Sequence, residues 1–251
     1  MKILVVVPTY NESQNIEKLI KTVFDLDSKF SAGHSVNILV VDDNSPDNTA
    51  GIVQDMINGK DDDKYIDRLH ILNREGKLGL GSAYVAGFKW GLKKGYDVIV
   101  EMDADFSHSP DYLPTMIDRL KEYDFIIGSR YVSGGGVKGW SFLRKFISIG
   151  GSYYARLILG IPLHDLTGGY NVWKKEVLES ISPDNIKSDG YSFQIELKYK
   201  AFCKGFKFSE VPIIFENRFR GKSKMSKRIV FEAMYRVWQF RFALDKGNAG
   251  F

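Results

Sequence analysis

The 251-residue chain lacks the features by which secreted and membrane-spanning proteins are recognised. It has one cysteine, Cys203, so an intrachain disulfide is excluded and a reducing compartment is favoured. No segment reaches the ~18 uncharged apolar residues of a transmembrane helix. The apolar run after Met1 is too short for a signal peptide and is interrupted at Pro8. We therefore expect a cytoplasmic protein, with Cys203 on a helix inside the apolar core.

A strong excess of one charge is also missing. The formal net charge is only +4, from 35 basic and 31 acidic residues, which is too weak to predict a nucleic-acid partner. The basic residues are nevertheless concentrated, because the span from Arg218 to Arg241 holds eight Lys or Arg and a single acidic residue, Glu232. Such a span favours contact with a phosphate ligand or with an anionic membrane surface.

The first half of the chain alternates strand-like and helix-like segments. Apolar runs predict strands at residues 2–7, 36–41, 69–72, 97–101 and 124–127. Helical periodicity predicts helices at 11–26, 47–56, 78–94 and 111–120, with Asn11 as the N-cap of the first. Strands separated by helices of this length require right-handed crossovers. The pattern therefore predicts the α/β class, with a mostly parallel central sheet flanked by helices.

The second half is less regular, and no linker separates it from the first, so we expect a single domain over residues 1–251. An apolar, aromatic segment at 140–159 predicts one helix or two, and residues 165–170 predict a turn. Further helices are expected at 190–202 and, with an amphipathic pattern, at 229–242. A strand is expected at 206–215, near a sheet edge because it contains Pro212.

Polar clusters follow three of the predicted strands. They are Tyr10-Asn11-Glu12, Asp42-Asp43 and Asp103-Ala104-Asp105. Because parallel strands place their carboxyl ends at one edge of the sheet, we expect these clusters to gather there. Asp103 and Asp105 have the spacing to hold a hard divalent cation, which in turn holds a diphosphate. The alternative is that each cluster is only a turn that ends a strand and caps the next helix.

Seven segments, taken in order, resemble the family-2 glycosyltransferases of the GT-A fold, a Rossmann-like nucleotide-binding fold. They are residues 7–12 (VPTYNE), 41–47 (VDDNSPD), 74–81 (REGKLGLG), 102–108 (MDADFSH), 128–131 (GSRY), 190–194 (GYSFQ) and 218–224 (RFRGKSK). The third and last segments are similar to the dolichyl- or polyprenyl-phosphate mannose synthases within that family.

The resemblance implies a sugar-nucleotide donor, GDP-mannose, bound by the half of the chain over residues 1–130. It assigns to the donor Pro8, Tyr10, Glu12, Val40, Asp42, Asp43, Asp103, Ala104, Asp105, Arg218 and Lys224. Asp103 and Asp105 would hold Mg²⁺ or Mn²⁺, with Asp105 the more direct ligand. Ser107 stands where some relatives carry a metal-neighbouring Gln, so its role stays open, and His108 is expected to be structural.

The resemblance also implies a polyprenyl or dolichyl monophosphate acceptor, bound by residues 131–251 together with Arg130. Arg130, Arg144 and Ser148 would contact the acceptor phosphate, and Asp105, Arg218 and Arg130 would be catalytic. A phosphate monoester is already ionised at neutral pH, so we expect no dedicated catalytic base. The expected reaction is a single displacement with inversion at the sugar.

Aromatic residues at 140–154 and 235–240 suggest a peripheral contact with the cytoplasmic face of a membrane. Core packing is the alternative for these residues, and a separate membrane-anchoring subunit is left open. Two other functions also remain: a family-2 transferase with another donor, such as UDP-glucose, or another acceptor, and a non-catalytic module that binds anionic lipid.

Overall fold

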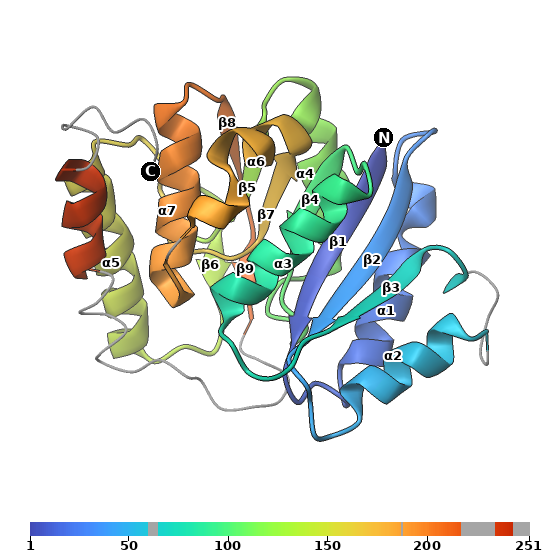
Figure 1. Cartoon of the computed structure of the whole chain (residues 1–251). Helices are drawn as coiled ribbons and strands as arrows, with labels where there is room; N and C mark the ends of the chain where they lie inside the picture. The colour runs from blue at the N-terminus through green and yellow to red at the C-terminus, as the bar shows by residue number, and fades with distance from the viewer. Residues whose placement is uncertain (60–64, 187, 217–233, 243–251) are drawn as a thin grey trace.

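The computed structural model describes residues 1–59, 65–186, 188–216 and 234–242, in which helices cover both faces of one seven-stranded sheet (Figure 1). The strand order is β3-β2-β1-β4-β7-β5-β8, and every strand except β7 runs parallel to the others. The strands are β1 (Lys2–Thr9), β2 (Ser35–Asp42), β3 (Leu69–Asn73), β4 (Val98–Glu101), β5 (Phe125–Ser129), β7 (Asn171–Lys174) and β8 (Phe208–Pro212). A two-stranded sheet pairs β6 (Gly136–Val137) with β9 (Ile214–Phe215). The predicted mostly parallel sheet is confirmed.

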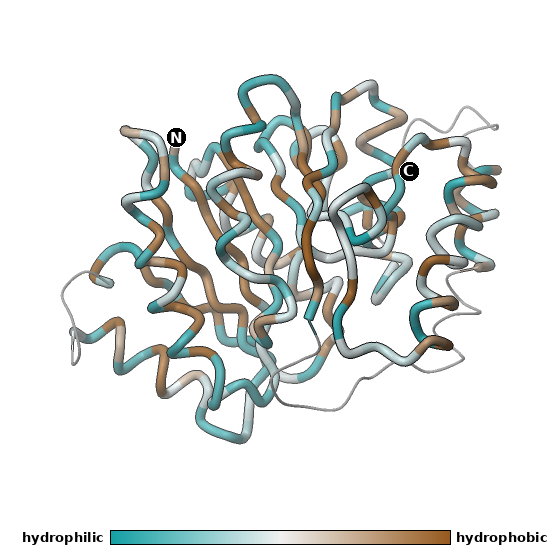
Figure 2. The backbone as a smooth tube through the Cα atoms, turned by 180° about the vertical axis from the view of Figure 1, so that it is seen from behind, coloured by the Kyte–Doolittle hydropathy of each residue, from teal (hydrophilic) through white to brown (hydrophobic). Residues whose placement is uncertain are grey.

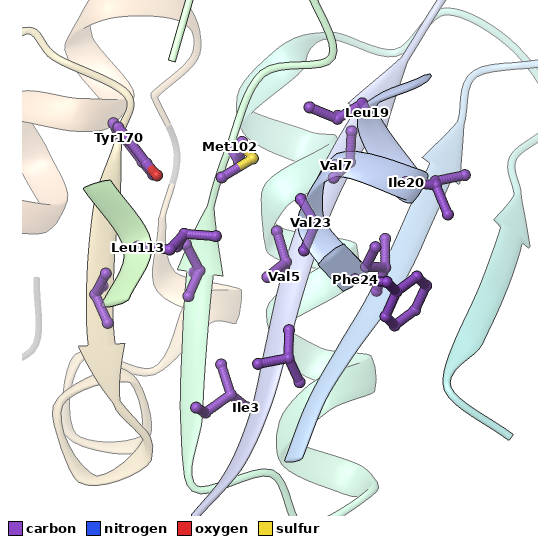
Figure 3. Close-up of a cluster of buried hydrophobic side chains, with 14 of the residues drawn as sticks. Ile3, Val5, Val7, Leu19, Ile20, Val23, Phe24, Met102, Leu113 and Tyr170 are labelled. Atoms are coloured by element: carbon purple, nitrogen blue, oxygen red, sulfur yellow. The ribbon is translucent and has the colours of Figure 1, made fainter. Parts of the chain in front are cut away.

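Alternation along β1 divides the apolar core into two layers. Ile3, Val5 and Val7 pack with α1 (Ile16–Asp25), α2 (Thr49–Ile57) and α4 (Leu113–Asp118), as Figure 3 shows for the first of these helices. Leu4 and Val6 point to the opposite face, which is covered by α3 (Leu80–Lys93), α6 (Lys175–Ile181) and α7 (Gly190–Cys203). Hydropathy is highest along these central strands (Figure 2). A strand buried on both faces explains the unbroken apolar run that predicted it.

The first helix begins later than its pattern predicted. Asn11 has a positive φ of 63° and lies outside the helix, so its predicted role as N-cap is wrong. Asn15 occupies the N-cap position, and its side chain donates to the Glu12 carboxylate at 2.8 Å. The predicted apolar stripe is confirmed, because Ile16, Leu19, Ile20, Val23 and Phe24 are all buried. Residues 11–15, which were predicted to be helical, instead form a turn at the carboxyl edge of the sheet, next to Tyr10.

The second half differs most from expectation. Residues 165–170 form the predicted turn, but β7 and α6 follow it and were not predicted. The predicted strand at 206–215 is two strands, with β8 at the sheet edge and β9 in the second sheet. Its edge position is confirmed. Cys203 is exposed at the end of α7, so its predicted place in the core is wrong.

The segment at 140–159 forms one helix, α5 (Phe142–Leu159). It begins after Ser141, whose hydroxyl accepts from the Arg144 amide, and it ends at Gly160, which has a left-handed φ of 65°. Residues 234–242 are helical and lie beside α5 (Figure 1), where the Trp238 indole donates to the Tyr154 hydroxyl at 2.9 Å. No helix in the described parts of the chain is long and apolar enough to cross a membrane.

Candidate functional site

The carboxyl ends of β1, β2 and β3 lie at the same height in the sheet, because their last residues pair with one another. Thr9 pairs with Asp42, and Asp42 pairs with Asn73. Beyond the strands, the Asp43 amide donates to the Thr9 carbonyl at 3.0 Å, and the Arg74 amide donates to the Asp42 carbonyl at 2.8 Å. The predicted convergence of strand-end motifs at one edge is therefore confirmed.

Asp42 organises the turn that follows β2. Its buried carboxylate accepts from the Thr9 hydroxyl at 2.7 Å, and from the Ser45 hydroxyl and amide at 2.6 and 2.8 Å. Both oxygens are thus engaged by neighbouring groups, as the turn interpretation predicted. Direct contact of this carboxylate with a nucleoside stays a prediction, and it would require sharing those oxygens.

Asp43 fixes the next loop against β2. Its carboxylate accepts from the Leu78 amide at 3.2 Å and forms an ion pair with Arg74, whose Nε lies 3.1 Å from Oδ1. Burial raises the pKa of Asp43 above its usual value, and the charge of Arg74 partly opposes that rise. The pair therefore holds residues 74–78 at the carboxyl edge.

The remaining residues of the first half that were predicted to bind the sugar-nucleotide donor differ in how deeply they are buried. Tyr10 is half-buried, and the Lys77 ammonium lies 4.3 Å above its ring. Pro8 and Glu12 are also half-buried at the same end of β1. Val40 is different, because it is fully buried with the α1 and α2 layer two residues before β2 ends. The structure therefore does not support a donor contact by Val40, because strand alternation points its side chain into the core.

Asp103 and Asp105 follow β4 directly, and each contacts groups of the same edge. Asp103 keeps about a quarter of its side chain exposed and accepts from the Tyr84 hydroxyl at 3.1 Å. Asp105 is buried and accepts from the Ser107 amide at 3.0 Å. Ala104 lies buried between them.

His108 supports the Asp103 backbone, as a structural role requires. Its Nδ1 accepts from the Asp103 amide at 3.3 Å, and its ring stacks on Tyr170 with a centroid distance of 5.0 Å. Burial lowers the pKa of His108, which favours the neutral ring.

This donor set fits a divalent cation that is also bound by a diphosphate. Two carboxylates supply hard oxygen ligands, and Mg²⁺ ordinarily takes few carboxylates beside phosphate and water oxygens. The buried Ser107 hydroxyl lies beside them and has no hydrogen-bond partner in the described residues, as expected of a group that needs a further ligand. No cluster of three or more His, Cys, Asp or Glu side chains that could hold a metal occurs in the described ranges.

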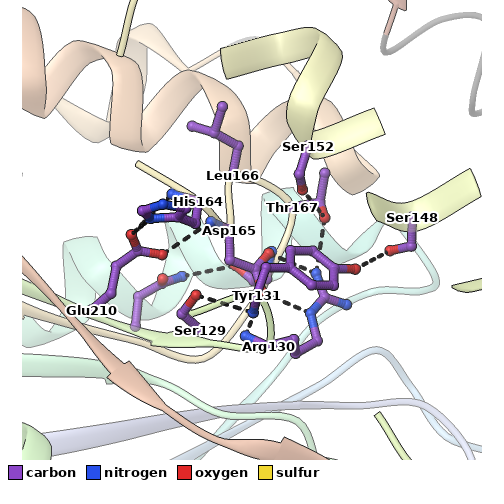
Figure 4. Close-up of polar contacts among 12 residues, drawn as sticks. Ser129, Arg130, Tyr131, Ser148, Ser152, His164, Asp165, Leu166, Thr167 and Glu210 are labelled. Carbon is purple, nitrogen blue, oxygen red and sulfur yellow. Dashed lines mark hydrogen bonds and ion pairs between the residues drawn. The ribbon is translucent and has the colours of Figure 1, made fainter. Parts of the chain in front are cut away.

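Arg130 follows β5 and is bound from one side by Asp165. Arg130 Nε and Nη2 each donate to a carboxylate oxygen at 2.7 Å, and Nη2 also donates to the Thr167 hydroxyl at 2.9 Å (Figure 4). Both partners are buried. The pKa of Asp165 is lowered to about 2, because the Arg130 charge and its hydrogen bonds outweigh burial. The predicted phosphate-binding cation is thus already part of an internal ion pair.

Arg144 and Ser148 lie near Arg130, as predicted for one acceptor site. The Arg144 guanidinium lies 4.0 Å from the Trp140 ring centroid, and that of Arg130 lies 5.7 Å from it. Ser148 accepts from the Tyr131 hydroxyl at 2.6 Å, which leaves the serine proton available to another acceptor. The structure brings together these three predicted residues. Arg218 and Lys224, and the 218–224 motif, lie outside the described residues.

A buried polar network behind this edge was not predicted. The Glu101 carboxylate accepts from Asn171, Trp173 and Gln194, and its burial raises its pKa to about 7. Lys198 donates to three backbone carbonyls of the 165–168 turn, and burial lowers its pKa to about 8. Gln194 belongs to the recognised 190–194 segment, and this segment was the one feature of the sequence that pointed to the network. The other members could not be identified, because their partners are distant in sequence.

Part of the predicted aromatic face is exposed. Along α5, Phe142, Phe146 and Tyr153 are 85%, 67% and 64% exposed, and Ile149 and Leu157 continue the same stripe. Tyr235 and Trp238 extend it on the neighbouring helix, but Phe240 is buried, so for this residue the alternative of core packing holds. The inward side of α5 carries Ser152, Ala155 and Leu159.

A cavity of about 330 Å³ lies at the opposite edge of the sheet, lined by Met1, Lys29, Phe30, His34, Arg119 and Lys121 among others. Its cations already have partners, since Lys29 pairs with Asp111 at 3.3 Å and Arg119 donates to the Ser209 hydroxyl. None of the recognised motifs reaches it. We therefore assign the chemistry to the carboxyl edge.

Comparison with solved structures supports the GT-A fold. Glucosyl-3-phosphoglycerate synthase from Mycobacterium tuberculosis, in complex with phosphoglyceric acid, superposes with a TM-score of 0.67 at 17% identity, covering 96% of this chain and 80% of that one. The same enzyme with Mn²⁺, uridine diphosphate and glucosyl-3-phosphoglycerate gives a TM-score of 0.66 at 18% identity. The predicted fold class is confirmed.

Sequence comparison identifies the family. Polyprenol monophosphomannose synthase of Mycolicibacterium smegmatis is 43% identical over 98% of this chain and 89% of its own length. Undecaprenyl-phosphate mannosyltransferase of Micrococcus luteus is 42% identical over 97% of this chain and 95% of its own. The model of glycosyl transferase family 2 matches residues 4–182. The predicted resemblance is thereby confirmed, and this chain is a glycosyltransferase that belongs to family 2.

Proposed function

We propose that this chain transfers mannose from GDP-mannose to a polyprenyl or dolichyl monophosphate, with a divalent cation and with inversion at the sugar carbon. The observation that carries the proposal is the placement of an Asp pair and a group of cations at one edge of the sheet. The names of the two relatives support the mannose and the polyprenyl phosphate. The division into a donor half (1–130) and an acceptor half (131–251) is part of the proposal.

On the donor side, Asp103 and Asp105 would hold Mg²⁺ or Mn²⁺ against the donor diphosphate. When bound, the cation supplies Lewis-acid stabilisation of charge on the departing nucleoside diphosphate. Tyr10, Glu12 and the loop fixed by Asp43 and Arg74 would border the nucleoside. Arg218 and Lys224 would bind the diphosphate.

On the acceptor side, Arg130, Arg144 and Ser148 would bind the phosphate that attacks the sugar. A phosphate monoester oxygen is ionised at neutral pH, so no side chain has to remove a proton during attack. Catalysis then consists of positioning and of electrostatic stabilisation.

The exposed stripe of α5 would lie against the cytoplasmic face of a membrane that holds the isoprenoid chain. Lys145 and Arg156 are on the same helix, and Arg236 and Arg241 are on its neighbour. Aromatic and aliphatic side chains flanked by cations are typical of helices that bind anionic lipid surfaces. An anchoring partner subunit would add to this contact but is not required by it.

A radiolabel transfer assay tests the proposal. It crosses GDP-mannose and UDP-glucose with a short polyprenyl phosphate and with water alone, in the presence of Mn²⁺, Mg²⁺ or EDTA. We expect lipid-linked mannose from GDP-mannose only, no product with EDTA, and recovery when the metal is restored. Transfer from UDP-glucose would replace the donor assignment. Binding to vesicles, with no transfer and no protection of the fold by GDP and Mn²⁺, would favour the non-catalytic module.

A further inference from the structure

Arg130 has five N–H donors, and its surroundings engage three of them. Asp165 accepts from Nε and from one hydrogen of Nη2, while the Thr167 hydroxyl accepts from the other. No hydrogen bond links Nη1 to the described part of the chain. The guanidinium is therefore fixed in its plane along one edge, and only Nη1 retains two donors for a ligand.

The turn that carries Asp165 and Thr167 is itself anchored by charged side chains. Glu210 on β8 accepts from the backbone amides of His164 and Asp165 at 2.9 and 3.0 Å. From the other side, Lys198 on α7 donates to the carbonyl of Gly168 at 2.6 Å. The Asp165 carboxylate also accepts from the Gly168 amide at 2.9 Å. The turn is thus held by several strong bonds to buried groups, and it can orient what it touches.

We propose that Asp165 and Thr167 are positioning residues that hold the Arg130 guanidinium so that Nη1 is the nitrogen that binds the acceptor phosphate. The inference rests on the proposed function for the identity of the phosphate. Asp165 and Thr167 themselves do not touch substrate. They restrict Arg130 to one orientation. Because Nε and Nη2 are already engaged, the guanidinium cannot bind a phosphate through two nitrogens, which is the bidentate mode common for arginine.

This arrangement also links the site to α5. The Thr167 hydroxyl lies 3.3 Å from the Ser152 hydroxyl on the buried side of that helix. One turn earlier on α5, Ser148 accepts from Tyr131, the neighbour of Arg130. The helix that carries the exposed apolar stripe therefore also carries the predicted phosphate ligand Ser148, and through Ser152 it contacts Thr167, which orients Arg130.

The test compares Thr167→Val, which removes the hydroxyl with little change in shape, with Thr167→Ser, which retains it. Thr22→Val is the matched control, because Thr22 is also half-buried and its hydroxyl donates to a backbone carbonyl far from the site. The readouts are KM for the short polyprenyl phosphate, KM for GDP-mannose, the melting temperature, and calorimetric binding of farnesyl monophosphate.

Thr167→Val removes one hydrogen bond to Arg130. We therefore expect a roughly five- to tenfold rise in the KM for the acceptor and in the Kd for farnesyl phosphate. The donor KM should stay within about twofold, and Thr167→Ser should restore the acceptor values. Asp165→Asn should have a larger effect in the same direction. An unchanged acceptor KM and Kd in Thr167→Val, or equal changes in both KM values with a lower melting temperature, would overturn the inference.

The binding measurement separates the two hypotheses. If wild-type protein binds farnesyl phosphate and Thr167→Val weakens that binding, the positioning role stands even when no mannose is transferred, and only the proposed function fails. If mannose is transferred and the variant binds as wild type does, the positioning role fails and the function stands.

Discussion

At the β1–β2 end of the carboxyl edge, Asp42 accepts hydrogen bonds from the neutral groups of Thr9 and Ser45. At the β5 end, Asp165 is paired with a buried guanidinium. Both carboxylates are fully buried, and each accepts from its own turn and from one residue 33 or 35 positions away, so the difference between them is the charge of the distant partner. The first end is therefore held by neutral hydrogen-bond donors, whereas the second depends on a buried pair of opposite charges.

The strongest test of this comparison concerns the carboxylates that lie between the two ends. Asp105→Ala should reduce kcat by roughly 10²–10³-fold or more, because it removes charge that acts on the leaving group. Stability should change far less than turnover; among the bonds removed is the one that the Ser107 amide donates. Transfer assays and thermal unfolding check both, with Asp184→Ala on the surface as the control. A full-rate variant would contradict the proposed mechanism.

The second test compares stability at the two ends. Lys198→Met should lower the free energy of unfolding by about 3 kcal/mol, because buried carbonyls and carboxylates lose a charged partner. Asp42→Asn keeps the shape and one of the two acceptor oxygens and leaves no charge unpaired, so we expect a loss of about 1 kcal/mol. Urea denaturation measures both. Equal losses would show that the charged network is no more critical than the local turn.

The third test uses pH. The pKa of Asp165 is lowered from 3.8 to about 2 in the folded protein, so its contribution to stability is present above the unfolded value and is lost as pH falls through the folded one. We expect this group to account for ~2 kcal/mol of the stability lost between about pH 4 and pH 2. Urea titrations at several pH values should show a shallower decline for Asp165→Asn. Parallel curves for variant and wild type would contradict the assignment.

The smallest expected effect concerns the exposed stripe. The double substitution of Phe146→Ser and Tyr153→Ser should weaken binding to anionic vesicles by about tenfold, because two exposed side chains lose apolar area that would be buried in lipid. Unfolding free energy should be nearly unchanged. Ile66→Ser, at an exposed apolar residue of another region, is the control in a flotation assay. Equal binding by all three proteins would favour a different surface.

The comparison also explains which predictions succeeded. The alternating strands, the edge where their motifs meet and the pair of Asp103 and Asp105 were predicted, because each depends on a short stretch of chain and on one rule for parallel sheets. The prediction of Asn11 as N-cap was wrong because several polar residues precede α1, and only the backbone path selects among them. Strand β7 was missed because its four residues mix polar and apolar side chains, and so short a segment shows no clear hydrophobic periodicity.

The family, the fold class and the residue types of the candidate site could be predicted from the sequence alone, because contiguous motifs and apolar periodicity are local properties. The pairing of Asp165 with Arg130, the bonds from Lys198 to the turn beside them and the orientation of α5, with Ser152 buried and aromatic rings exposed, could be seen only in the folded chain. The cause of this difference is burial. A charge removed from water must find its partner among whatever residues the fold brings near, and those residues lie on strands and helices far apart in the chain.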